Sequence, residues 1–357
     1  MRKRLLAIIA TAAFVVAMMP SMVFGAETAV STDEQFKTAI ASANDGDVIK
    51  LDSDITINEE ISINANVTID GQNHTITCTY EKPLRLYNSA TIKNVTIKNT
   101  ANNGRCIDTR VGNITVNLEN VVLDATGTTN TQPLTIGGSA PNVTVNIKGS
   151  KINALDSGYA AIIFVPATIN ISDSSELIGY TALYFKDGSN NSVVNVKNSK
   201  LTGINNHSGV SNAFGTIVFE DDDITINVDN STISGTSMGD QTQTVFMESE
   251  YANYTEPNVV NVYNGSKIIA DNSETIATVS ATNKVVFKDA TCSVEIPAEF
   301  IAEGYAQDKT TGVVSKIETN KPEASPATGD NSMAPIAVAG LVLAAMAAVV
   351  ATRRRTN

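Results

Sequence analysis

Three arginines and one aspartate are the side chains in this sequence best suited to ionic chemistry. Apart from the basic residues at the two ends of the chain, its arginines are Arg85, Arg105 and Arg110, and Asp108 lies between the last two. Arg85 and Arg110 are 25 residues apart, which is about the length of one coil of the repeat described below, so they could lie on adjacent coils. Guanidiniums placed in this way can bind a carboxylate bidentately. The four residues are therefore candidates for a catalytic or anion-binding site. The simpler hypothesis, which we favour, is three solvated arginines, because an exposed arginine needs no partner.

An acidic run offers the one candidate for a metal site. Asp221, Asp222 and Asp223 follow Glu220 directly and could hold calcium on a loop, but they lack the alternating spacing of a dedicated calcium loop. We therefore favour a solvated acidic turn. The two histidines and three cysteines form no close-spaced pair, which argues against a zinc or iron site. The sequence thus predicts no cofactor, with calcium at the acidic run as the alternative.

Two tyrosines are the candidates for binding a sugar. The chain has no Trp, and an aromatic ring with a polar tip suits a partly wet binding surface. Tyr251 and Tyr254 lie in the polar loop 248–256, within one of two long insertions, residues 203–216 and 235–258. Repeat proteins place binding surfaces on such insertions. We expect a stacking platform there.

The cysteines Cys78, Cys106 and Cys292 are an odd number for an exported chain. We favour the interpretation that they are small buried residues. A disulfide between Cys78 and Cys106 is the alternative, and the sequence does not decide between the two.

A repeated phrase defines the elements that must position these side chains. It reads aliphatic, Asn, aliphatic, any residue, turn residue, and its asparagines are Asn117, Asn146, Asn170, Asn195, Asn227 and Asn261. With looser copies at both ends, the turn residues are Asn94, Asn120, Gly149, Asp173, Asn198, Asn230, Asn264 and Asp289. Alternating β-branched residues indicate strands, and Asn, Gly or Asp at a fixed place indicates a left-handed backbone. Because such a unit cannot bury its apolar face alone, the copies must stack into a parallel β-helix.

A second strand in each coil has the pattern aliphatic, any residue, Phe. The copies are Ile162-Ile163-Phe164, Leu183-Tyr184-Phe185 and Ile217-Val218-Phe219, with Thr244-Val245-Phe246 a looser one. Period two places both apolar positions on one face, so we expect the phenylalanines to stack in the bore as a core ladder. The repeated asparagines lie between inward aliphatic residues and should form a ladder on the surface.

Both ends of the coils should be covered. Thr32 to Gln35 form a capping box, and apolar residues follow at helical spacing, which predicts an amphipathic helix over residues 31–46 at the open end of the bore. Coils then occupy residues 47–295. Residues 296–317 resemble a closing segment of bacterial surface β-helices, and a polar linker follows over 318–324.

The helix and the following strand, Val67 to Gly71 with its Ile-Asp-Gly ending, make residues 31–295 similar to the pectin-lyase-like right-handed β-helix superfamily. The resemblance implies an all-β fold, a single right-handed parallel β-helix with an N-terminal capping helix. Because the superfamily contains pectate lyases and polygalacturonases, it also implies an alternative function, a polysaccharide lyase or hydrolase acting through the three arginines and Asp108. The Gly-His-Gly and Arg-x-Lys motifs of its inverting glycosidases do not occur here.

Both ends of the chain look like targeting signals. Residues 1–25 combine a basic start, an apolar run and small residues, as in a secretory signal peptide. Near the other end an apolar span, residues 335–351, is followed by arginines and preceded by Ser325, Pro326, Ala327, Thr328 and Gly329. Residues 325–357 resemble the Leu-Pro-x-Thr-Gly cell-wall sorting signal of Gram-positive surface proteins, with Ser325 in place of Leu. The resemblance implies that a sortase cuts after Thr328 and joins it to peptidoglycan; an uncleaved transmembrane helix is the alternative.

The net charge of the chain limits the kinds of partner that it can bind. Between the two processing points the chain keeps 19 of its 25 basic and 36 of its 37 acidic residues, a net charge near −17, which argues against nucleic acid or anionic membrane as partners. We expect a protein at the bacterial surface, anchored in the wall or membrane. The favoured function is a non-catalytic rod that adheres to a host or environmental glycan or to a protein. The lyase or hydrolase and a structural spacer are the alternatives.

Overall fold

The computed structural model describes residues 25–125, 130–205, 214–237, 243–249, 255–270, 277–278 and 284–318. All of these except Glu318 belong to one compact unit, Met1–Ile317. The predicted secretory signal, the sorting signal 325–357 and all but the first residue of the linker lie outside the described residues. Within the described part of the chain, no helix is long and apolar enough to cross a membrane.

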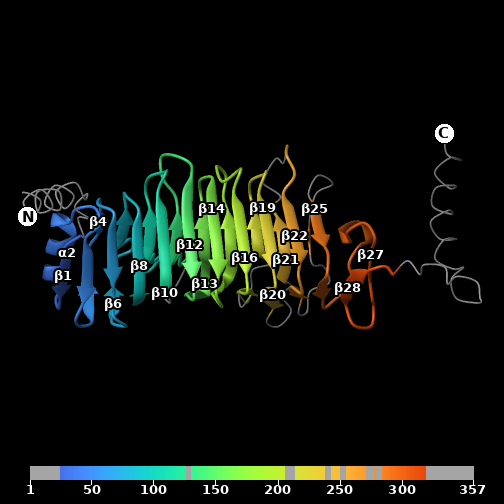
Figure 1. The fold of residues 1–357 in the computed structure, drawn as a ribbon, viewed down its shortest axis with the longest axis horizontal. Coiled ribbons are helices and arrows are strands. Elements are labelled where there is room, and N and C mark those ends of the chain that lie inside the picture. The colour runs from blue at the N-terminus through green and yellow to red at the C-terminus, as the bar shows by residue number, and fades with distance from the viewer. Residues whose placement is uncertain are drawn as a thin grey trace, which may run out of the picture. The chain divides into compact units, whose positions relative to one another are not determined.

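The described chain winds into a single solenoid of parallel strands, and successive coils follow one another along its axis (Figure 1). One face, which we call the ladder face, carries the repeated asparagines. It is formed by β1 (Glu27–Val30), β2 (Val48–Leu51), β5 (Val67–Asp70), the first parts of β8 (Ala90–Asn99) and β10 (Thr115–Ala125), β12 (Val143–Lys148), β14 (Ala167–Ser172), β16 (Val193–Lys197), β19 (Thr225–Asp229), β22 (Val259–Tyr263) and β25 (Lys284–Phe287).

Two further faces complete each coil. The second consists of β3 (Ile55–Ile57), β6 (Thr75–Cys78), the last parts of β8 and β10, the first parts of β13 (Lys151–Ile163) and β15 (Glu176–Phe185), β17 (Lys200–Asn205), β20 (Thr232–Ser237), β23 (Lys267–Ala270) and β26 (Ala290–Cys292). The third, which we call the groove face, consists of β4 (Ile61–Ile63), β7 (Leu84–Leu86), β9 (Ile107–Thr109), β11 (Leu134–Ile136), the ends of β13 and β15, β18 (Phe214–Phe219), β21 (Gln243–Glu248) and β24 (Ala277–Thr278).

The turn after the asparagine phrase has the predicted left-handed backbone. All eight turn residues have φ between 45° and 57°: Asn94, Asn120, Gly149, Asp173, Asn198, Asn230, Asn264 and Asp289. Asn, Asp and Gly tolerate this conformation better than other residues do. The same local geometry at the same place in each coil brings the asparagine phrases into register. The repeat prediction is confirmed.

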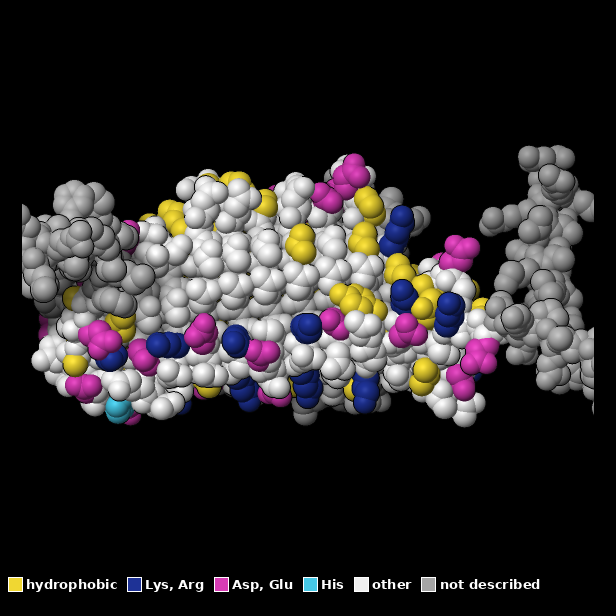
Figure 2. All heavy atoms as spheres, in the orientation of Figure 1, with side chains coloured by type: hydrophobic (Ala, Val, Ile, Leu, Met, Phe, Trp, Pro, Cys, Tyr) yellow, Lys and Arg dark blue, Asp and Glu magenta, His cyan; other side chains and the backbone are white. Residues whose placement is uncertain are grey.

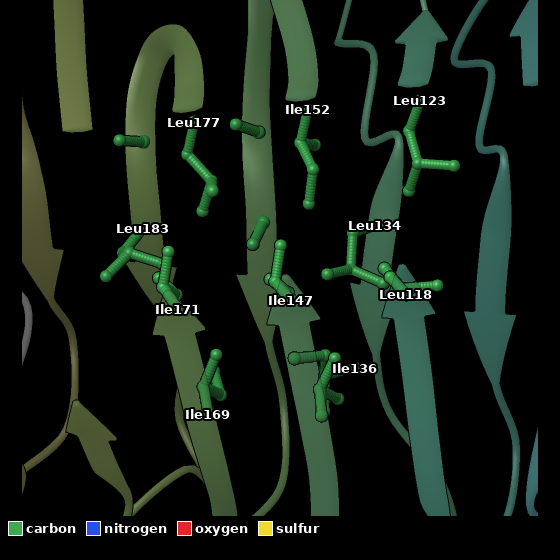
Figure 3. Close-up of a cluster of buried hydrophobic side chains, with 14 of the residues drawn as sticks. Leu118, Leu123, Leu134, Ile136, Ile147, Ile152, Ile169, Ile171, Leu177 and Leu183 are labelled. Atoms are coloured by element: carbon green, nitrogen blue, oxygen red, sulfur yellow. The ribbon is translucent and has the colours of Figure 1, made fainter. Parts of the chain in front are cut away.

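Aliphatic side chains fill the bore. Alternate residues of each strand point inward, as Val116 and Leu118 do in β10, and neighbouring rungs stack (Figure 3). Burying one such side chain contributes about 1.5–3 kcal/mol, whereas a typical outward hydrogen bond contributes about 1 kcal/mol. The bore therefore supplies most of the stability of the solenoid.

Short segments cover the two ends of the bore. Helix α2 (Asp33–Ser42) begins after Thr32, whose hydroxyl accepts a hydrogen bond from the Gln35 amide, and it buries Phe36 and Ile40 against the first coil. At the other end, the 3₁₀ turn η1 (Ala298–Phe300) precedes β27 (Tyr305–Gln307) and β28 (Val313–Lys316), and β28 pairs antiparallel with β26. Phe300 is buried there.

The three cysteines lie in the core. Cys78, Cys106 and Cys292 are buried and carry no disulfide, so the structure agrees with the first interpretation of these residues. Burial raises the pKa of the Cys78 thiol to about 12 and also raises the pKa values of the other two. The thiols are therefore protonated at neutral pH.

Candidate functional site

The structure brings the four ionic candidates together on the groove face. Arg85 at the centre of β7 and Asp108 at the centre of β9 are register partners. Arg85 lies between the buried Leu84 and Leu86, and Asp108 lies between the buried Ile107 and Thr109. Arg105 and Arg110 flank β9 at its two ends. The Asp108 side chain is fully buried, and its Oδ2 lies 3.1 Å from Arg105 Nη1, 3.7 Å from Arg85 Nε and 3.7 Å from Arg110 Nη1. We call these four residues the arginine cluster.

The charged groups of the arginine cluster form ion pairs mainly with one another. Arg85 also pairs with Glu60, with 3.1 Å between Nη1 and Oε2. Burial lowers the pKa of the Arg85 guanidinium, but Glu60, Asp108 and Tyr87 together raise it by more, so its net shift is upward. Burial raises the pKa of Asp108, and the three guanidiniums limit that rise. A guanidinium held in its charged form is a poor proton acceptor, so this arrangement favours an ion-pair cluster over a catalytic base.

A hollow of about 450 Å³ opens beside the arginine cluster, further along the groove face. We call it the aromatic hollow. Its apolar lining comes from β13, β15 and the residue after β13, and consists of Tyr159, Ile162, Phe164 and Tyr184. Its polar lining comes mainly from the segments that lead into the strands, and consists of Glu81, Asn103, Arg105, Asn130, Gln132 and Lys186. Arg105 therefore belongs to both features.

The two tyrosine rings of the hollow are held by contacts with neighbouring side chains. The Tyr159 and Tyr184 rings meet edge to face, with centroids 4.7 Å apart and an interplanar angle of 61°. Lys186 Nζ lies 4.8 Å from the centroid of the Tyr184 ring and pairs with Glu220, to which the Tyr184 hydroxyl also donates. These contacts fix the tyrosine rings, because a ring packed on two sides keeps one rotamer.

Buried polar atoms beside the rings have no partner within the described chain. They include Arg105 Nε and Gln132 Oε1, both from residues that line the hollow, and Asp108 Oδ1 in the cluster next to it. Leaving a buried donor or acceptor unpaired costs about 1–3 kcal/mol. Water or the polar groups of a ligand in the hollow would remove that cost.

The prediction that Phe164 belongs to the core ladder of phenylalanines is wrong. The aliphatic-any-Phe phrase aligns Phe164 with Phe185, but the structure pairs Ile163 with Phe185. A shift of one residue moves a side chain to the other face of a strand, so Phe164 points outward and is 36% exposed. Phe185 and Phe219 do stack in the bore, with centroids 5.7 Å apart. The alternation of Ala161, Ile163 and Val165, all buried, was the signal that could have revealed the correct register.

The acidic run binds neighbouring loops. Asp221 accepts hydrogen bonds from the amides of Gly188 and Asn190 at 2.8 and 2.9 Å. Asp222 accepts from the Thr255 amide and hydroxyl, both at 2.7 Å. Asp223 is exposed and has a φ of 54°. Among the described residues, no group of three or more His, Cys, Asp or Glu side chains is arranged to hold a metal ion.

The remaining predicted site residues cannot be placed. Tyr251 and Tyr254, and the processing residues Ser325 to Gly329, lie outside the described residues. The aromatic hollow itself was not predicted, because its residues belong to five successive coils and no local motif joins them.

Comparison with known proteins gives one partial family match. Residues 27–136, from β1 to the end of β11, match a family model described as "Putative pectate lyase-like adhesive domain". The match covers less than half of the chain and ends before the rings of the aromatic hollow. Together with the observed coils, it agrees with the predicted pectin-lyase-like parallel β-helix. No curated protein matches the chain.

Three solved structures align with the chain at low identity. A structure titled "L. reuteri 53608 SRRP" is 17% identical, with 74% of this chain and 98% of that chain covered and a TM-score of 0.43. The pectate lyase Pel9A is 13% identical, with 75% and 72% covered and a TM-score of 0.35. The PL6 family alginate lyase AlyGC is 14% identical, with 84% and 56% covered and a TM-score of 0.20. At such low identities and TM-scores, none of these likenesses bears on the activity of this chain.

Proposed function

We propose that this protein is a surface adhesin whose β-helix presents the aromatic hollow to a saccharide. The observation that carries the proposal is the meeting of three aromatic rings with amide and guanidinium groups in one outward hollow. Sugar rings have apolar C–H faces and a rim of hydroxyls, so they fit a site that offers ring faces beside polar donors and acceptors. The adhesive family matched by residues 27–136 supports the same role.

The arginine cluster supports the binding role by position. It lies next to the hollow and shares Arg105 with it. In the lyase alternative, one of these arginines would have to give up its proton, and the ion pairs with Asp108 and Glu60 oppose that. We therefore assign the cluster to holding Arg105 in place at the edge of the hollow.

A glycan array with the purified protein tests the proposal. We expect one class of glycan to bind and Phe164→Ala to weaken that binding about tenfold, the effect of losing one ring contact. The matched control is Tyr87→Ala, since Tyr87 is also 36% exposed and occupies the corresponding position three rungs away on the same face. Equal binding by both variants and the unmodified protein would remove the hollow from this role. New unsaturated or reducing ends would instead support the enzyme.

We also propose that the protein is exported and attached to the cell wall through Thr328. The predicted secretory signal, residues 1–25, and the sorting signal, residues 325–357, support this. Mass spectrometry of material released from digested walls should identify a peptide ending at Thr328 and linked to a peptidoglycan fragment. A chain that keeps residues 329–357 and is extracted by detergent would support the uncleaved membrane anchor.

A further inference from the structure

The asparagine ladder ends one rung before the last strand of its face. From Asn146 to Asn261, each Nδ2 donates to the Oδ1 of the asparagine one rung before, at 2.8–3.0 Å. The ladder begins where Asn117 donates to Thr91 Oγ1 at 3.2 Å. The next rung after Asn261 carries Val286 in register. Valine has no donor, so within the described chain no group donates to Asn261 Oδ1.

The free oxygen is the acceptor end of a polarised chain. All the ladder amides donate in the same direction, toward the N-terminal coils, and hydrogen-bonded amides in a chain strengthen one another. The last carbonyl oxygen therefore carries more negative partial charge than a single exposed Asn would. A donor placed against Asn261 Oδ1 would continue the ladder.

A hollow of about 260 Å³ lies at this point, and its lining includes Asn261, Tyr263, Val286 and Lys288. Tyr263 and Lys288 occupy the column beside the ladder, where acidic and basic side chains alternate in the earlier coils except at Ser172 (Figure 2). Lys288 has no ion-pair partner among the described residues, and its Nζ lies 5.9 Å from the Tyr305 ring centroid. Hydrophobic side chains gather with basic ones toward the C-terminal end of this face (Figure 2). The end of the ladder thus combines an acceptor, a cation, an aliphatic surface and a ring.

We propose that this hollow, which we call the ladder-end hollow, binds the N-acetyl group of an amino sugar. The N–H of the acetamido group would donate to Asn261 Oδ1, its methyl group would contact Val286, and its carbonyl oxygen would accept from the Lys288 ammonium. The sugar ring would lie against Tyr263. A neutral sugar without the acetamido group satisfies only part of this set. A carboxylate would pair with Lys288 but would face the electronegative Asn261 oxygen, which disfavours acidic sugars.

Val286→Asn tests the proposal, because it supplies the missing rung. An asparagine there would donate to Asn261 Oδ1, as its equivalents do in the earlier coils, and would remove both the free acceptor and the aliphatic contact. The probe is N,N′-diacetylchitobiose, titrated calorimetrically into the purified full chain. We expect binding that exceeds that of cellobiose, and a loss of about tenfold in Val286→Asn, with a melting temperature equal to or above that of the unmodified protein.

A second pair of variants distinguishes loss of the binding site from misfolding. Lys288→Gln should also weaken binding of the probe, whereas Lys148→Gln should not, because Lys148 lies in the same column beside Asn146, where the ladder is continuous. The proposal is overturned if the probe binds no better than cellobiose, if Val286→Asn binds it as well as the unmodified protein, or if Lys148→Gln weakens the binding as much as Lys288→Gln does.

Discussion

The ladder face and the groove face of the solenoid use their outward side chains in opposite ways. On the ladder face, one column repeats asparagine from coil to coil, and each amide binds its neighbour. On the groove face, the corresponding column changes at every rung, and from β7 to β15 it runs Arg85, Asp108, Thr135, Ile162 and Tyr184.

Repetition lets a column satisfy its own hydrogen-bonding groups, because each rung offers a donor to the acceptor of the next. A column that changes leaves buried charges and unpartnered polar atoms among the described residues, as at Asp108 and Arg85. On this solenoid, both candidate binding sites therefore lie where repetition fails. Both hollows obey that rule: the aromatic hollow lies on the changing column, and the ladder-end hollow lies where Val286 interrupts the asparagines.

The largest expected effect separates the bore from the groove face. Phe185→Ala removes a fully buried ring that stacks on Phe219 and should lower the free energy of unfolding by about 3–5 kcal/mol. Phe164→Ala should lower it by about 1 kcal/mol or less, since that ring is 36% exposed. Urea unfolding followed by circular dichroism measures both. Similar losses would mean that Phe164 belongs to the core after all.

The arginine cluster should give the next largest effect. Arg105→Gln removes the nearest donor, at 3.1 Å, from the buried Asp108 carboxylate and should cost about 2 kcal/mol of unfolding free energy at pH 7. The folded pKa of Asp108 is already raised, and the substitution raises it further. The deficit should therefore shrink as the pH falls through the folded pKa, because a protonated Asp108 needs no cation.

Arg110→Gln is the control for that experiment. Its guanidinium is 3.7 Å from the same oxygen and its side chain is 38% exposed, so we expect a loss below about 1 kcal/mol. Equal losses for both substitutions, or a deficit independent of pH, would contradict the assignment of Arg105 as the main partner of Asp108.

The ladder should respond more weakly than the cluster. Asn170→Ala removes two ladder hydrogen bonds, one of 2.8 Å to Asn146 and one of 2.9 Å from Asn195, and should cost about 1–2 kcal/mol. Thr168→Ala, exposed on the same strand, should change stability by about 0.5 kcal/mol or less. If the two substitutions are equivalent in thermal unfolding, the ladder hydrogen bonds do not stabilise this face.

The acidic run should give the smallest effect. The amide and hydroxyl of Thr255 and the Glu256 amide lower the pKa of Asp222. A lowered folded pKa means that the stabilisation is present above the ordinary carboxyl pKa, near 4, and is lost as the pH falls through the folded value. Asp222→Asn should therefore cost roughly 0.5–1 kcal/mol at pH 7 and nothing at about pH 2, where unfolding of both proteins should coincide. A difference that persists in acid would point to a role other than charge.

Much of the scaffold could be predicted from the sequence, because its causes are local. Period-two alternation determines which residues of a strand point inward. The left-handed turn residues, Asn94 and the seven that correspond to it in the other coils, mark where the strand of the ladder face ends in each coil. The Thr32 cap and the apolar spacing after it predict α2. Once these features repeat, stacking brings the asparagines into register without further information.

The sites depend on distances between coils, and those distances are irregular. On the groove face 23 residues separate Arg85 from Asp108, but 27 separate Asp108 from Thr135. Loops of varying length therefore determine which side chains lie side by side on neighbouring coils. A register difference of one residue between β13 and β15 places Phe164 on the surface. The sequence alone determined a stacked repeat of strands with a left-handed turn in each coil. Only the tertiary structure decided that three arginines converge on one carboxylate and that three rings meet beside them, because both depend on how unequal coils come into register.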